Sequence, residues 1–180
     1  MNIEQIKNQL PDYAKDIKLN LSTVMTVEGA PELTLKQIYF IATASAHATG
    51  NKNFIQALIK TSSQHLADNE MNAAKSAASI MAMNNVYYRF IHLVNDKAFA
   101  AMPAKLRMNV IANPGIDKID FELGCLAVSA INGCGMCMDA HARELEKSGV
   151  GKPGIQSTVR IASVINAVAG VMVMEDGIDY

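Results

Sequence analysis

Apolar residues recur along this chain at the three- and four-residue spacing of an amphipathic helix. One such face, in the segment that follows Pro11, carries Tyr13, Ile17, Leu21 and Val24. The alternation that marks strands is scarce, and no Asn-Gly or Asp-Gly turn separates two such runs. Good helix formers fill the long stretches instead. The pattern predicts an all-α protein of roughly seven or eight helices.

Prolines and capping residues divide this pattern into segments. Thr34 is a suitable N-cap for one helix and Asp68 for a longer one. Gly149 is predicted to follow the end of a helix, and Pro153 to lie in the first turn of the last helix. The predicted helices between the first and the last therefore cover about 34–49, 53–66, 69–94, 118–131 and 134–148, with an irregular connector at 103–114.

A weak internal duplication is one interpretation of the sequence. An offset of 83 residues pairs Ala44 with Ala127, Gly50 with Gly133 and Ala57 with Ala140. Three identities leave a structural repeat and chance both open. In a true repeat, Asn51 and Phe54 would stand where Cys134 and Cys137 stand, so only the second half would carry thiol chemistry.

The composition narrows the class of protein. The chain has 180 residues, of which 50% are hydrophobic and 18% charged, so we expect one folded domain over 1–180. A net charge of −1 gives no electrostatic reason to expect nucleic acid or an anionic membrane as partner. No signal peptide is visible, and the apolar run 161–174 is shorter than the ~20 residues of a membrane span. We therefore expect a cytoplasmic protein.

The informative motif is a cysteine pair at a predicted helix start. Cys134 and Cys137 follow Gly133 and lie three residues apart. Unpaired N–H groups and the positive dipole end of a first turn stabilise a thiolate. Helix N-termini and Cys-x-x-Cys sites lower the pKa of a thiol from about 8.5 to roughly 3.5–7.5. In a reducing compartment such a pair points to redox chemistry or a metal site, here within about 118–150.

Two further residues complete a candidate catalytic set. His141 lies four residues after Cys137 on the same helix face, where an imidazole can accept a thiol proton or return one to a leaving group. Glu122 lies on the packed face of the preceding apolar helix, and a buried carboxylate needs a partner. His141 is the obvious one. The candidate catalytic residues are therefore Cys134, Cys137, His141 and Glu122.

Other interpretations of these residues remain open. Two inert buried thiols are a less favoured interpretation of the cysteine pair. A zinc site would use the pair and His141 with Glu122 or Cys125, although structural zinc usually takes two separated ligand pairs. Haem attachment is excluded because Met138 stands where the haem motif requires His. Cys125 and the methionines are interpreted as core residues, and 84–89 as a packing or subunit-contact segment.

The chain resembles the AhpD-type alkylhydroperoxidases of the carboxymuconolactone decarboxylase-like superfamily. The likeness extends over nearly the whole length. It includes the segments 11–21, 81–86 and 106–115 and, most specifically, 121–123 and 127–134. The resemblance implies an all-helical fold, a homotrimer, and reduction of alkyl hydroperoxides by a vicinal dithiol.

The resemblance also implies a role for each candidate residue. Cys137 would be the thiol that peroxide oxidises to sulfenic acid, and Cys134 the partner that donates a proton and closes the disulfide. Glu122 and His141 would form the proton relay. Electrons would come from a dihydrolipoyl group on an acyltransferase, and a partner peroxiredoxin would be re-reduced in turn. No bound cofactor and no metal are expected.

Met136 departs from the pattern of the family. The family motif commonly reads Cys-x-His-Cys, and a thioether cannot carry a proton as that histidine can. Loss of a general acid–base group typically costs 10²–10⁴-fold. Met136 therefore favours a rival interpretation, a non-peroxidatic electron carrier between a lipoyl protein and a peroxiredoxin. Acid–base chemistry on a carbon substrate is a third, disfavoured because it would not require the cysteine pair.

Overall fold

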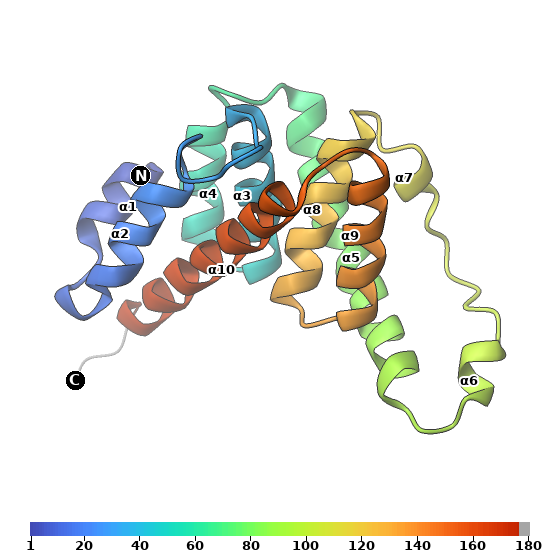
Figure 1. Ribbon diagram of the computed structural model, residues 1–180. Coiled ribbons are helices and arrows are strands. Elements are labelled where there is room, and N and C mark those ends of the chain that lie inside the picture. The colour runs from blue at the N-terminus through green and yellow to red at the C-terminus, as the bar shows by residue number, and fades with distance from the viewer. Residues whose placement is uncertain (177–180) are drawn as a thin grey trace.

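The computed structural model describes residues 1–176 of the protein, and within them all regular structure is helical (Figure 1). The all-α prediction is confirmed. Residues 1–176 contain ten α helices where seven or eight were expected, because α1, α6 and α7 are too short to be detected from hydrophobic periodicity. In chain order the elements are α1 Ile3–Gln9, the 3-10 turn η1 Asp12–Ala14, α2 Lys15–Val24, α3 Leu35–Thr49, α4 Lys52–Ser62, α5 Asp68–Leu93, α6 Ala98–Ala101, α7 Asn109–Ala112, α8 Lys118–Ile131, α9 Gly135–Lys147 and α10 Lys152–Glu175.

Most of the predicted helix ends are confirmed. Thr34 caps α3, and Gly149 follows α9 in the left-handed conformation with φ +89°. The predicted cap Asp68 is wrong, since it is the first residue of α5 and Ala67 precedes the helix. The side chain of Glu70 accepts the N–H of Ala67 instead, at 2.9 Å. A carboxylate reaching back from the third helical position thus replaces the expected side-chain cap.

The helix α8 lies at the centre of the molecule. Leu123 and Leu126 pack into a core shared with α3 and α10, whereas Phe121 and Val128 pack into a second core with α5. A Cβ atom at Gly124 would lie 2.7 Å from the ring of Phe40, so the glycine permits the close approach of α3. Because residues 120–129 of α8 are buried, a polar side chain among them must find its partner inside the protein.

The helix bounds repeat at the offset of 83 residues. Shifted by that offset, α3, α4 and α5 fall on 118–132, 135–145 and 151–176, which are the places of α8, α9 and α10. The turns match as well, since Gly50 and Gly133 have φ of +72° and +67°. Asn51 caps α4 with its side-chain oxygen, as Cys134 caps α9 with its sulfur. The structure therefore favours the repeat, with thiols in the second half alone.

The last helix is long and apolar enough, by composition, to cross a membrane. Half of its most apolar window is buried inside the protein, and it packs against α2, α3 and α8. Ile161 and Ile165 on this helix are fully buried in the core. These contacts are those of a core helix, as the sequence indicated.

The end of α5 leaves the compact body and carries exposed apolar side chains. Figure 1 shows α6 as the element furthest from the body at this end, joined to it by the long connector that leads to α7. Residues 86–102, here called the apolar arm, expose Val86, Leu93 and Met102 by 62%, 70% and 61%. Within the arm, the rings of Phe90 and Phe99 pack edge to face at 5.2 Å.

Candidate active site

The cysteine pair is positioned by the sharp turn between α8 and α9. Gly133 takes the left-handed conformation that glycine adopts without strain, and Cys134 follows as the N-cap of α9. The N–H of Cys137 donates to the Sγ atom of Cys134 at 3.3 Å. The two residues form a disulfide, with Cα atoms 5.3 Å apart, inside the usual range of 4.4–6.8 Å. The first helical turn thus brings the two sulfurs together, as the resemblance implied.

The two sulfurs differ in their surroundings. Cys134 is completely buried, whereas Cys137 retains 6% exposure and lines a cavity. The N-terminal cysteine of the turn is therefore the less exposed of the two. The reason is local, because the side chain of an N-cap residue folds back over the first turn. A molecule that enters the cavity meets Cys137 first.

Glu122 and His141 form a buried pair beside the cysteines. Oε2 of Glu122 lies 2.6 Å from Nδ1 of His141, and both side chains are almost wholly enclosed. Glu122 comes from the central helix α8 and His141 from α9, two turns beyond Cys134. The predicted pairing of Glu122 with His141 is thus confirmed. Such a pair can accept a proton from a reacting group and return it while shielded from solvent.

The second nitrogen of His141 contacts a methionine. Nε2 lies 3.2 Å from Sδ of Met81 on α5, and Oγ of Ser129 donates to the same sulfur at 3.5 Å. Asn85 in turn donates to Ser129 at 3.0 Å and accepts from Asn132 at 2.9 Å. In the disulfide form no hydrogen bond within residues 1–176 joins His141 to a cysteine sulfur.

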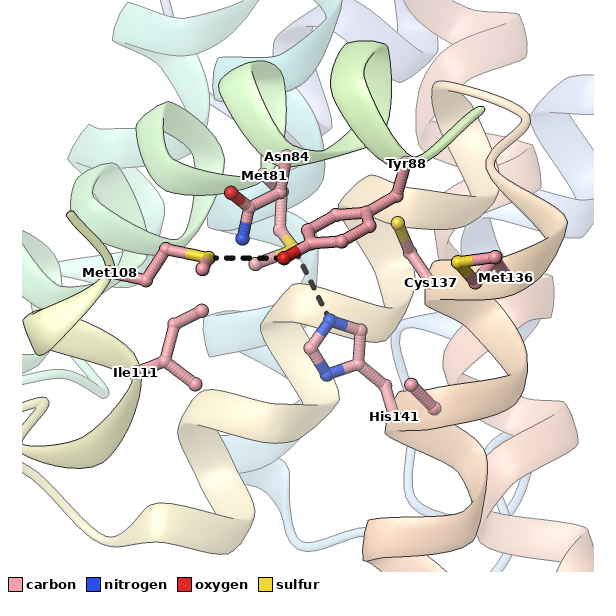
Figure 2. Close-up of a pocket in the computed structure, with 9 residues that line it drawn as sticks. Met81, Asn84, Tyr88, Met108, Ile111, Met136, Cys137 and His141 are labelled. Carbon is pink, nitrogen blue, oxygen red and sulfur yellow. Dashed lines mark hydrogen bonds between the residues drawn. The ribbon is translucent and has the colours of Figure 1, made fainter. Parts of the chain in front are cut away.

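A cavity of about 240 Å³ opens between α5, α7 and α9. Figure 2 shows side chains from α5 and α9 facing one another across it. Its walls are largely apolar, with a few polar groups among thioethers and aliphatic side chains. The lining residues are Met81, Asn84, Tyr88, Met108, Ile111, Met136, Cys137, Ala140 and His141.

Cys125 stands apart from this arrangement. It is fully buried in the second core and does not line the cavity. Burial raises the pKa of its thiol well above the usual value, and the nearby charge of Glu122 adds to the effect. Among residues 1–176 no group of three or more His, Cys, Asp and Glu side chains is arranged to hold a metal ion.

Sequence reasoning missed several residues of the cavity. Met81 was interpreted as core filling, and Asn84 and Tyr88 as packing residues. They share one face of α5 at helical spacing, which is a signal that the sequence does carry. Met108 and Ile111 come from the irregular connector and α7, where no periodicity could have placed them.

The comparisons agree with the helical fold. Residues 97–174 match the carboxymuconolactone decarboxylase family. Alkyl hydroperoxide reductase AhpD of Coxiella burnetii (strain RSA 493 / Nine Mile phase I) is 53% identical over 174 residues, covering 97% of this chain and 98% of the relative. The AhpD proteins of Maricaulis maris and of Bradyrhizobium sp. (strain BTAi1 / ATCC BAA-1182) are 50% and 53% identical over 175 and 169 residues. They cover 97% and 94% of this chain, and 99% and 92% of their own lengths.

Identity at this level over nearly the full length extends well beyond the cysteine motif. The chain therefore belongs to the AhpD family of alkyl hydroperoxide reductases.

Proposed function

We propose that this protein is an antioxidant thiol peroxidase that reduces alkyl hydroperoxides with Cys134 and Cys137. The observation that carries the proposal is the position of Cys137. Its sulfur is bonded to that of Cys134 and also lines an apolar cavity that contains His141. Apolar walls bind an alkyl group more favourably than they bind water. The printed names of the relatives, alkyl hydroperoxide reductases, support the same substrate class.

The proposed reaction begins at Cys137. Its thiolate attacks the terminal oxygen of the hydroperoxide, the O–O bond breaks, and an alkoxide leaves. The pair formed by Glu122 and His141 takes up the thiol proton and returns it to the alkoxide as alcohol. The sulfenic acid on Cys137 then condenses with the thiol of Cys134, releasing water and forming the disulfide. In total, one dithiol and one hydroperoxide give a disulfide, an alcohol and water.

Reduction of the disulfide needs two electrons from outside the protein. We propose a dihydrolipoyl group on an acyltransferase as the donor, acting by thiol–disulfide exchange without a bound cofactor. Cys137, which retains 6% exposure and lines the cavity, is the cysteine that such a thiol can reach. This protein would also reduce a partner peroxiredoxin by thiol–disulfide exchange, and the peroxiredoxin would then remove further peroxide. This cycle requires a reducing compartment, which supports a cytoplasmic location.

We also propose a homotrimer. The apolar arm exposes Val86, Leu93 and Met102 on one side of the molecule, and contact with further copies of the chain would bury them. The arm also continues into the connector that supplies Met108 to the cavity. Assembly through the arm would thus fix one wall of the active site.

A non-peroxidatic electron carrier is the alternative. The observation in its favour is Met136, which lines the cavity where the family motif has a histidine and can carry no proton there. A carrier needs only the two sulfurs and a base, all of which are present. The two functions differ in whether peroxide is consumed by this protein alone.

Anaerobic turnover with dihydrolipoamide separates the two functions. The protein is supplied with the reductant and cumene hydroperoxide, with and without a peroxiredoxin. The thiol peroxidase should consume peroxide in both mixtures, and Cys137→Ser should abolish the consumption. Turnover confined to the mixture with peroxiredoxin would replace the peroxidase by the carrier.

A further inference from the structure

Asn84 brings an unpaired amide to the wall of the cavity. The residue is 96% buried, since only 4% of its surface is exposed, and its Oδ1 atom has no hydrogen-bond partner among residues 1–176. Figure 2 shows its side chain projecting from α5 into the same space as the ring of Tyr88, opposite Ile111 and His141. Buried polar groups are normally hydrogen-bonded, so an unpaired one in the wall of a cavity that Cys137 also lines calls for a ligand.

The next residue along α5 shows the contrast. Asn85 is equally buried, but its amide donates to Ser129 and accepts from Asn132, at 3.0 and 2.9 Å. Of these two neighbouring asparagines, Asn85 therefore has a hydrogen-bonded amide and Asn84 does not. Helix packing accounts for Asn85 but gives Asn84 no bonding role in the fold.

The other polar side chains of the cavity lining, Tyr88 and His141, each have a contact within the protein. Tyr88, one turn further along α5, makes only a long contact of 3.9 Å to the sulfur of Met108. His141 is engaged at both ring nitrogens, by Glu122 and Met81. The remaining walls are apolar. A ligand with one polar end and one apolar end would therefore place its polar end at Asn84.

We propose that Asn84 is a substrate-binding residue that holds the –OOH group of a hydroperoxide beside Cys137. An amide offers one acceptor oxygen and two N–H donors, which match the O–H donor and the acceptor oxygens of a hydroperoxide. Met108, Ile111 and Met136 line the space left for the organic group. The inference rests on the proposed peroxidase function and adds a residue that sets the approach of the O–O bond to the sulfur.

Replacing each asparagine by leucine, which has a similar volume, tests the inference. The rate constant for oxidation of the reduced protein is measured in a single turnover, with cumene hydroperoxide and with hydrogen peroxide. Asn84→Leu should lower it at least tenfold for both, because both carry the –OOH group. Its thermal midpoint should equal or exceed that of the wild type, since an unpaired buried polar group is removed. Asn85→Leu should lower the midpoint, because Ser129 and Asn132 lose their partner.

A second variant separates loss of the amide from obstruction of the cavity. Asn84→Ala removes the amide without filling space and should lose rate by a similar factor. The inference is overturned if Asn84→Leu reacts like the wild type, if only the leucine variant is slow, or if Asn84→Leu is destabilised as much as Asn85→Leu. A wild type that does not react with either peroxide would contradict the proposed function itself, which is a different result.

Discussion

The imidazole of His141 is held from two sides. Glu122 on α8 contacts Nδ1, and Met81 on α5 contacts Nε2, so the ring bridges two helices through side chains that are all buried. A thioether is a weak acceptor, and this one is also bonded by Ser129. A ring bound in this way keeps its orientation, which is what a relay beside Cys137 requires.

Glu122→Gln tests the relay at the scale of one residue. Glutamine keeps the size and hydrogen-bonding capacity of the side chain, so the fold should be retained, but it cannot take up a proton. We expect the rate of peroxide consumption to fall at least tenfold, as is typical when a general acid–base group is lost. The measurement is the single-turnover rate, with the thermal midpoint recorded beside it.

Glu144→Gln is the matched control for this change. Glu144 lies on α9 in an exposed pair with Lys118, with 2.9 Å between the charged atoms. Exposed ion pairs contribute little to stability, and this one is not part of the cavity lining. Its variant should react at the wild-type rate. An unchanged rate in Glu122→Gln as well would make Glu122 a structural acid and remove it from the relay.

At the scale of elements, the sequence predicts the features that neighbouring residues determine, such as the ends of a helix. The bounds of α8 agree with the prediction because Asp117 caps a strongly apolar helix whose end is fixed by the turn at Gly133. The cysteine pair could be placed at the start of α9 for the same reason. The offset of 83 residues, visible in a few identities, reappears in the bounds of six helices.

Contacts between distant elements could not be predicted in this way. The contact of His141 with Met81 joins residues 60 positions apart, and no spacing rule connects them. Met108 reaches the cavity from an irregular connector, where hydrophobic periodicity carries no information. The inward position of Cys134 depends on its role as the N-cap of α9, a geometry that the spacing of the cysteines does not reveal.

At the scale of the whole molecule, the apolar arm predicts assembly. We expect light scattering after gel filtration to give about three times the chain mass of 19.4 kDa. Leu93, at the end of α5, is 70% exposed, and a charge there would be costly to bury between copies. Leu93→Glu should therefore lower the mass toward that of one chain. Leu19→Glu is the control, since Leu19 is 57% exposed on α2, outside the arm.

A wild-type mass of one chain at micromolar concentration would contradict assembly through the arm. Equal dissociation by both glutamate variants would place the contact elsewhere. Because the arm leads into the connector that lines the cavity, dissociation should also lower the rate with peroxide.

The central claim is that Cys137 attacks the peroxide and Cys134 resolves the product. It is tested most directly by trapping the intermediate. Each single variant, Cys134→Ser and Cys137→Ser, is treated with one equivalent of cumene hydroperoxide and then dimedone, and the adduct is located by peptide mass spectrometry. Cys134→Ser should carry the adduct on Cys137 without turnover, because the sulfur in the cavity is present but its resolving partner is not. Cys137→Ser should carry none. An adduct on Cys134 in Cys137→Ser, with none on Cys137 in Cys134→Ser, would reverse the roles of the two sulfurs and contradict the account.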